Sequence, residues 1–221
     1  MIAPGIAFYS TSTTKSNEEL AAGVAAISAQ LVEDFCPAWG KLPITATFYP
    51  DPKQIPAGTP AVQLADRCDV PQALAYHTES ANGRIRGLVG ILTCEEDGES
   101  WTSAASHEAT EAARNPFVNG WTTTTGHGGH RKVADEVADP VQDGTYEKNG
   151  VEVSNFVYPA WFDGHAPAGS KFDHLGQLSA PFTKTAGGYF EIDTNGVVTQ
   201  LGDKPRHRAH IKHDDQVAAE E

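Results

Sequence analysis

The residues from 101 to 116 carry the spacing in this chain that is best suited to metal chemistry. They read WTSAASHEATEAARNP and place His107, Glu108 and Glu111 in an HExxE pattern. Residues four apart lie on one face of an α-helix, so His107 and Glu111 can reach a single metal ion, while Glu108 points to one side. The pattern matches the HExxH helix of zinc sites, with a carboxylate in place of the second imidazole. It predicts a metal-binding helix, although an ordinary polar helix face has the same spacing.

A hydrolytic zinc site needs three protein ligands, an open coordination position and a base beside it. Glu136 is the best downstream candidate for the third ligand, after His107 and Glu111. Asp139 follows three residues later, and we expect it to hold the imidazole of His107 through the second ring nitrogen, with both carboxylates on one partner helix. Glu108 is predicted to be the general base that activates water for hydrolysis of an amide bond in a peptide substrate.

Hydrolysis also requires a donor for the oxyanion that develops on the carbonyl. Tyr158, His165 and His174 lie in a Pro/Gly-rich aromatic segment and are three candidates, among which the sequence does not choose. The histidines of the HGGH stretch, His127 and His130, offer an alternative pair of imidazole ligands. Exposed loop residues are the simpler interpretation of that stretch.

Zinc is the predicted metal. One imidazole and two carboxylates would cancel the charge of Zn²⁺, whereas two imidazoles and one carboxylate leave the site positive. A neutral site polarises water less and suits harder cations, so Ca²⁺ and Mn²⁺ are alternatives. The pattern therefore favours metal binding more strongly than fast hydrolysis.

A long helix is predicted to begin at residue 16. Ser16 and Glu19 form a capping-box pattern, in which each side chain satisfies a backbone amide of the other. Pro37 and Gly40 are expected to end the helix. An apolar stripe with helical spacing follows the cap and consists of Leu20, Val24, Ile27, Leu31 and Phe35. We expect this helix to pack across a sheet.

Short apolar runs predict the strands of that sheet at residues 6–9, 43–49, 61–65, 73–78 and 85–94. Asn82 and Gly83 lie between the last two runs and favour a hairpin there. Downstream, Asn149-Gly150 and Asn195-Gly196 predict two further hairpins, within residues 146–157 and 189–201. Residues 121–132 and 158–181 are interpreted as loops.

These elements predict one α+β domain over residues 1–201. Residues 1–116 would form a mixed sheet packed on the long N-terminal helix and the HExxE helix, and residues 117–201 would supply the third ligand and the hairpins. This order resembles the zincin metallopeptidases, in which the strand nearest the metal helix binds an extended substrate. Residues 202–221 have too little apolar surface to fold alone and form a polar tail.

Composition narrows the classes of partner. The chain has 16 basic and 29 acidic residues and a net charge of −13, with no dense basic cluster before the tail, which argues against nucleic-acid binding. No run of about 18 apolar residues predicts a membrane span, and no signal peptide is recognised. The three cysteines, Cys36, Cys68 and Cys94, are widely spaced and are interpreted as reduced thiols.

Five blocks follow one another along the chain: ALAYHT, SHEATEAARNP, DEVADPV, VEVSNFVYPAWFD and FDHLGQLSAPFTKTAGGYFEID. In this order they resemble a family of uncharacterised bacterial and phage-associated zincin-like proteins. More distantly, the SHExxE and ExxD parts are similar to plant phosphate-induced (exordium-like) proteins. The resemblance implies a shared set of His107, Glu108, Glu111, Glu136 and Asp139 and supplies no activity. Ala109 and Ala138 depart from the family pattern, which has an aliphatic residue and a Cys there.

The phage context of these relatives implies a second function of a different class. The chain would then be a structural or decorating component of a phage or phage-like particle that keeps a zincin scaffold with a structural metal. The polar tail would contact other protein subunits of that assembly. The expected location is the virion or particle, and otherwise the cytoplasm.

Overall fold

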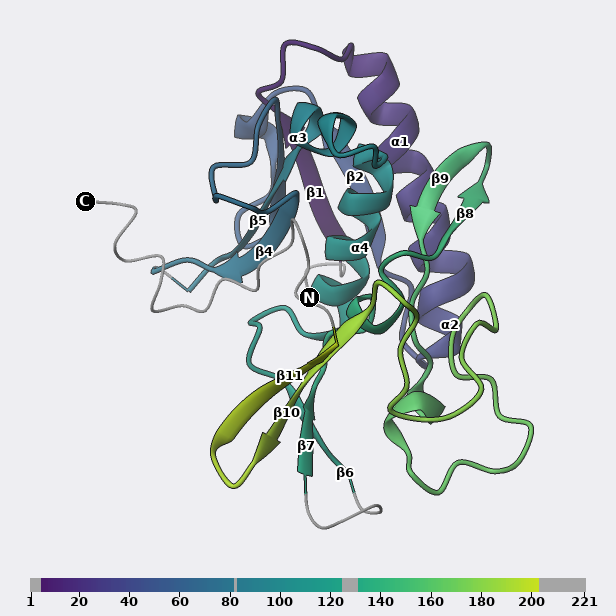
Figure 1. The fold of residues 1–221 in the computed structure, drawn as a ribbon. Coiled ribbons are helices and arrows are strands. Elements are labelled where there is room, and N and C mark those ends of the chain that lie inside the picture. The colour runs from purple at the N-terminus through teal and green to yellow at the C-terminus, as the bar shows by residue number, and fades with distance from the viewer. Residues whose placement is uncertain (1–4, 82, 125–130, 203–221) are drawn as a thin grey trace.

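The first half of the chain builds a five-stranded mixed sheet in the order β2-β1-β3-β5-β4 (Figure 1). The computed structural model describes residues 5–81, 83–124 and 131–202. The strands are β1 (Gly5–Ser10), β2 (Thr45–Tyr49), β3 (Ala61–Ala65), β4 (Ala75–Glu79) and β5 (Ile85–Gly90). β4 is antiparallel to β5, whereas the other neighbours are parallel, so the chain forms an α+β fold with β4 at one edge of the sheet.

Helix α1 (Asn17–Gln30) begins where the capping box predicts. The Ser16 hydroxyl accepts a hydrogen bond from the Glu19 amide at 3.2 Å, and the Glu19 carboxylate accepts one from the Ser16 amide at 2.9 Å. The helical path then continues through a π-helical turn, η1 (Leu31–Phe35), and a short helix, α2 (Cys36–Ala38). Every member of the predicted apolar stripe is buried. The capping box and the apolar periodicity therefore predict the position of this helix correctly.

Helix α4 (Trp101–Arg114) carries the HExxE residues and lies on the same sheet face as α1 (Figure 1). The Ser100 hydroxyl caps its start by accepting a hydrogen bond from the Thr102 amide at 3.2 Å. All its residues except Arg114 are buried, because β4 and β5 contact it on one side and α1 and β9 on others. Its many alanines let these neighbours come close. The HExxE carboxylates therefore lie inside the protein.

Gly23 of α1 lies against the start of α4. A Cβ at this position would lie 2.5 Å from Trp101 and 2.9 Å from Thr102. We expect Gly23→Ala to lower the free energy of unfolding by about 1–3 kcal/mol through overpacking, although alanine favours a helix by about 1 kcal/mol. Urea denaturation of both proteins measures the difference. Ala25→Gly, at an exposed position of the same helix, measures the effect of helix propensity without overpacking. If Gly23→Ala made the protein more stable than the wild type, that would contradict the close contact between α1 and α4.

Four of the five strands predicted in the first half are confirmed, and the fifth was predicted to extend further than it does. Residues 85–94 were expected to form one strand, but β5 ends at Gly90 and helix α3 (Ile91–Glu96) begins there. Ile91 and Cys94 are the buried residues of α3, at helical spacing. A side chain at Gly90 would collide with the backbone nitrogen of Cys68, so the chain turns where only glycine fits. A short apolar run does not distinguish strand from helix by itself.

The second half forms a four-stranded antiparallel sheet in the order β11-β10-β7-β6 and a separate hairpin. The sheet contains β6 (Trp121–Thr124), β7 (Arg131–Ala134), β10 (Tyr189–Thr194) and β11 (Val197–Gly202), and the hairpin contains β8 (Thr145–Lys148) and β9 (Val151–Ser154). Both Asn-Gly turns predicted for this half of the chain are confirmed. Asn149 and Gly150 have φ values of 54° and 77°, and Asn195 and Gly196 have 57° and 85°, as hairpin turns of this kind require.

The predicted loop at residues 121–132 is partly strand, because β6 and β7 occupy its two ends. His127 and His130 lie outside the described residues, as does the polar tail beyond Gly202. The segment 158–181 is an ordered loop, as expected, except for one 3-10 helix, η4 (Pro159–Phe162). Asp173 anchors it by accepting hydrogen bonds from the amides of Gln177 and Leu178 at 3.0 and 2.7 Å.

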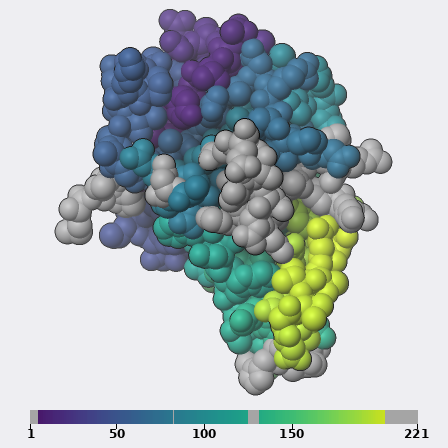
Figure 2. Space-filling view, turned by 90° about the vertical axis from the view of Figure 1, so that its left-hand side faces the viewer, coloured from purple at the N-terminus to yellow at the C-terminus, as the bar shows by residue number. Residues whose placement is uncertain are grey.

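One hydrophobic core joins the two halves. Phe8 and Phe35 from the first half share it with Phe156 and Trp161 from the second, and all four side chains are fully buried. The β10–β11 hairpin extends away from this core (Figures 1 and 2). Among the described helices, none combines the length and apolar character needed to cross a membrane.

Candidate metal centre

Four segments that are distant in the sequence bring ionisable side chains into one buried cluster. β4, α4, the segment after β7 and β10 meet there. The cluster consists of His77, His107, Glu108, Glu111, Glu136, Asp139 and Tyr189, each at most 5 % exposed. Charged groups at this depth require close partners, since burial without them is costly.

Glu111 lies at the centre of the cluster, between two imidazoles. Its Oε1 atom is 3.2 Å from Nε2 of His107, and its Oε2 atom is 4.0 Å from Nδ1 of His77. The backbone amide of Ala138 also donates a hydrogen bond to Oε1 at 3.2 Å. The position of the Glu111 carboxylate is therefore fixed from both sides.

Asp139 contacts His107, as predicted, but at a different nitrogen. Its Oδ1 atom lies 3.1 Å from Nε2 of His107, the same nitrogen that faces Glu111. The sequence analysis expected Asp139 at the second ring nitrogen, away from the metal position. Asp139 instead points into the cluster and adds its charge to it.

His77 is one of two cluster residues that the sequence analysis missed. It lies on the edge strand β4, where its Nε2 atom is 3.2 Å from the backbone oxygen of Asn115 and its Nδ1 atom is 2.9 Å from Oε2 of Glu108. A carbonyl oxygen only accepts hydrogen bonds, so Nε2 carries a proton and Nδ1 is the nitrogen that faces the carboxylates.

The cluster determines the charge of His77. Burial lowers the pKa of this imidazole, but the hydrogen bond to Glu108 and the charges of Glu136, Glu108 and Glu111 more than offset that effect and raise the pKa to about 9. In the metal-free protein His77 is therefore protonated at neutral pH and donates to Glu108. The imidazole is held where a cation would also be attracted.

Among the described residues, two groups of three have ligand atoms within 4.8 Å of one another. One group contains His77, Glu111 and Glu136, and the other contains His107, Glu108 and Glu111. Glu111 belongs to both. The predicted ligands His107, Glu111 and Glu136 are all in the cluster, but they are divided between the two groups.

The segment that carries Glu136 and Asp139 is not the helix that was expected. Residues 135–138 are irregular, and a 3-10 turn, η3 (Asp139–Val141), follows them. Pro140 has no backbone N–H and could not donate to the carbonyl of Glu136, so an α-helix through both residues is disfavoured. Both carboxylates still reach the cluster, since Oε1 of Glu136 accepts a hydrogen bond from the side chain of Asn115 at 2.6 Å.

Asn115, at the end of α4, links the cluster to the loop that follows. Its side-chain oxygen accepts hydrogen bonds from the amides of Asn119 and Gly120 at 3.2 and 2.7 Å. Its Nδ2 donates to Glu136, and its backbone oxygen accepts from His77. One residue thus orients a carboxylate and an imidazole together.

We expect Asn115→Asp to lower the free energy of unfolding of the metal-free protein by about 1–3 kcal/mol. Aspartate has the same shape as asparagine and keeps the side-chain oxygen that accepts hydrogen bonds. It removes the Nδ2 donor to Glu136, however, and places a second carboxylate beside that of Glu136. Denaturation after dialysis against a chelator measures the change. Asn119→Asp, at an exposed position, is the matched control and should stay within about 0.5 kcal/mol. Equal stability of the two variants would contradict this role of Asn115.

Tyr189 is a second residue that sequence analysis assigned no role. Burial raises the pKa of its hydroxyl well above the ordinary value, and the charges of Asp139 and Glu111 and a hydrogen bond to Asp139 act in the same direction. Gly188 permits this approach, because a side chain there would collide with the backbone oxygen of Pro140. Tyr189 therefore presents a neutral hydroxyl to the cluster.

The three predicted oxyanion donors have other surroundings. The hydroxyl of Tyr158 and Nδ1 of His174 lie 3.2 Å apart, and the His174 ring stacks on Phe156 with centroids 5.2 Å apart. His165 is exposed. Tyr189, in contrast, places its hydroxyl against the cluster.

Short motifs along the chain converge on this centre. AYHT contributes His77, SHEATE contributes His107 and both helix carboxylates, DEVAD contributes Glu136 and Asp139, and GGY contributes Tyr189. An isolated histidine in the apolar run ALAYHT was the one signal that could have identified His77. Function is thus inferred from the geometry of these buried side chains. No protein-family model, curated protein or solved structure matches the chain.

Proposed function

We propose that the cluster binds a divalent metal ion and that the protein is a metal-dependent, peptidase-like hydrolase. The observation that supports this most directly is the excess of buried acid. Four carboxyl groups, of Glu108, Glu111, Glu136 and Asp139, share the cluster with two imidazoles, so its formal charge is negative even with both imidazoles protonated. A divalent cation would neutralise that formal charge.

His77, Glu111 and Glu136 are the proposed ligands. The bond from Nε2 of His77 to the Asn115 carbonyl leaves Nδ1 as the coordinating atom, which is how backbone carbonyls orient histidine ligands at metal sites. The ligand atoms of this group lie within 4.8 Å of one another. One imidazole and two carboxylates suit Zn²⁺, and Mn²⁺ or Ca²⁺ as alternatives.

A bound divalent ion would supply Lewis acidity toward a substrate carbonyl and toward water. Glu108 lies 2.9 Å from Nδ1 of His77, so its carboxylate is beside the proposed metal position. We assign to Glu108 the transfer of a proton from the attacking water to the leaving amine. Tyr189, whose raised pKa keeps it protonated at neutral pH, is the assigned donor to the developing oxyanion.

The position of His77 favours a peptide as the substrate. β4 is the edge strand of the five-stranded sheet and has a strand neighbour, β5, on one side. An extended peptide can pair with the other side of such a strand through backbone hydrogen bonds. A peptide bound in this way would pass close to the imidazole of His77 and to α4.

Metal analysis of the purified protein tests the proposal. We expect about one divalent ion per chain by elemental mass spectrometry, as a single site requires. Chelation should abolish cleavage of an unfolded protein such as reduced casein, and separate additions of Zn²⁺, Mn²⁺ and Ca²⁺ should show which ion restores it. Absence of stoichiometric metal after refolding with each ion would rule out the proposed site.

The structural role in a phage-like particle stays a prediction. It depends on the polar tail, which lies outside the described residues beyond Gly202. Deletion of residues 203–221 should leave the metal content unchanged and reduce incorporation into particles. Normal incorporation of the shortened chain would count against that role.

A further inference from the structure

Strand β11 forms one edge of the four-stranded sheet and exposes apolar side chains there. All six of its residues pair with β10, which is its only neighbour among the described strands. The exposed fractions are 65 % at Val197, 40 % at Val198 and 38 % at Leu201. Figure 2 shows the β10–β11 hairpin, in yellow, at the surface of the molecule. A strand edge of this kind is a template for pairing with another chain.

The usual devices that protect an edge strand are missing from β11. Its sequence, VVTQLG, contains no charged residue and no proline. Its register with β10 runs without a bulge from the pair of Gly202 and Tyr189 to the pair of Val197 and Thr194. Charged side chains, prolines and bulges are the features that keep edge strands from pairing with other chains. Nothing within β11 itself therefore opposes a partner strand.

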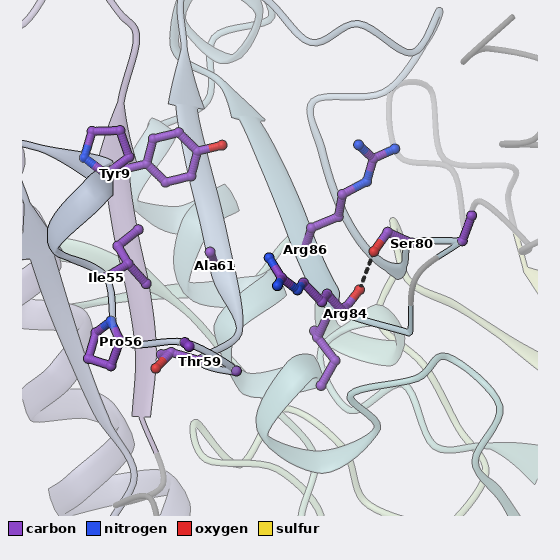
Figure 3. A pocket seen from close by; sticks show the side chains of 13 residues that line it. Tyr9, Ile55, Pro56, Thr59, Ala61, Ser80, Arg84 and Arg86 are labelled. Carbon is purple, nitrogen blue, oxygen red and sulfur yellow. Dashed lines mark hydrogen bonds between the residues drawn. The ribbon is translucent and has the colours of Figure 1, made fainter.

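The other sheet edges of the described chain differ from β11. β6, at the far side of the same sheet, has four residues, and β2 is followed at once by Pro50. β4 ends at Glu79, and the turn after it brings a further charge with Arg84. The Ser80 hydroxyl closes that turn by donating to the backbone oxygen of Arg84 at 2.8 Å (Figure 3). β11 is therefore the edge best suited to pairing with another copy of the chain.

The sequence of β11 is complementary to itself in the antiparallel direction. Val197, Thr199 and Leu201 alternate with their neighbours and lie on one face of the sheet. If Thr199 of two copies lie opposite each other, Val197 of each copy lies opposite Leu201 of the other, because antiparallel strands run in reverse order. Both ends of the pairing then join two apolar side chains. Centring the pairing one residue earlier or later would leave Leu201 or Val197 without a partner in the strand.

Charge is compatible with an identical partner at this strand. The whole chain carries a net charge of −13, so two copies repel one another in general. The neighbouring strand β10 carries Glu191 and Asp193, and Asp193 lies 3.9 Å from Lys132. In two copies paired through β11, the carboxylates of β10 would be three strand spacings apart, about 14 Å. This distance exceeds the Debye length of about 8 Å at physiological salt, so their repulsion is largely screened.

We propose that the protein forms a two-fold symmetric dimer by antiparallel pairing of β11 with β11 of a second copy, with Thr199 on the axis. The two four-stranded sheets then form one continuous sheet. Backbone hydrogen bonds along the edge provide affinity, and the contacts between Val197 and Leu201 fix the register. A two-fold contact uses the same surface on both copies, so the assembly closes at two subunits.

Light scattering coupled to size-exclusion chromatography tests the proposal. We expect a dimer at about 100 µM that dissociates on dilution, since one pair of strands makes a small interface. Thr199→Lys places two ammonium groups opposite each other and should raise the dissociation constant at least about tenfold. Thr123→Lys adds the same charge at an exposed position of β6 and should leave the dissociation constant unchanged. Circular dichroism confirms that both variants are folded.

Cysteine cross-linking tests the register without relying on a loss of binding. Thr199→Cys should form a disulfide between two copies on mild oxidation, because opposite residues of antiparallel strands have Cβ atoms about 4.5–5.5 Å apart, close to disulfide geometry. Thr123→Cys and the wild type, with its three native cysteines, are the controls. Three outcomes would overturn the proposal: a monomeric wild type at about 0.5 mM, a dimer that Thr199→Lys leaves intact, or equal cross-linking of Thr199→Cys and Thr123→Cys.

Discussion

Glu108→Gln is expected to lower the rate of peptide-bond hydrolysis by about 10²–10⁴-fold and to leave the metal content unchanged. General acid–base catalysis contributes an effect of this size, and an amide cannot take a proton from water at neutral pH. The substitution keeps the shape of the buried side chain, and in the metal-free protein its amide oxygen can still accept the hydrogen bond from His77. Initial rates on reduced casein, measured beside elemental analysis of the same samples, give both quantities.

Glu147→Gln is the matched control for this experiment. Glu147 lies on β8 and is exposed, so the same chemical change there should alter neither activity nor metal content. Loss of metal in Glu108→Gln would assign Glu108 to the ligands, in the second group with His107 and Glu111. Equal activity in Glu108→Gln and the wild type would remove Glu108 from catalysis.

His77→Ala is expected to weaken metal binding by at least about 100-fold, and more than His107→Ala does. Loss of a residue that only orients a ligand costs about 10- to 100-fold in metal affinity, and loss of a ligand should reach or exceed the upper end. The Asn115 carbonyl holds Nε2 of His77, which leaves Nδ1 directed at Glu108 and Glu111. Nε2 of His107 lies between the carboxylates of Glu111 and Asp139. Competition with a chromogenic chelator measures both affinities.

Glu111→Gln provides the reference for the histidine comparison, because Glu111 belongs to both candidate groups. It should lose metal whichever imidazole coordinates the ion. Retention of metal in His77→Ala together with its loss in His107→Ala would move the site to the ligands that the HExxE spacing predicts. Retention in all three variants would exclude metal binding at this cluster.

Local signals in the chain predicted much of the fold. The Ser16 capping box, the apolar stripe behind it and the Asn-Gly pairs at residues 149 and 195 each depend on residues close in sequence. Backbone hydrogen bonds and φ preferences at these places involve only near neighbours, so the pattern and the structure agree.

Two elements were predicted wrongly because their conformation depends on contacts with residues distant in the sequence. Residues 91–94 satisfy a strand pattern and a helix pattern equally, and close contact between Gly90 and Cys68 ends the strand. Residues 135–139 were expected to be helical by analogy, but they are held as an irregular segment against α4, with the Ala138 amide bonded to Glu111.

The residues of the metal centre also divide into those that the sequence identifies and those that only the tertiary structure brings in. Helical periodicity alone places His107, Glu108 and Glu111 on one turn of α4, so these residues could be identified without a structure. The approach of His77 from β4 and Tyr189 from β10 depends on sheet pairing and on the close packing of Gly188 against Pro140. Packing therefore selects which imidazole and which hydroxyl meet the carboxylates, because those distances are set between elements and not along the chain.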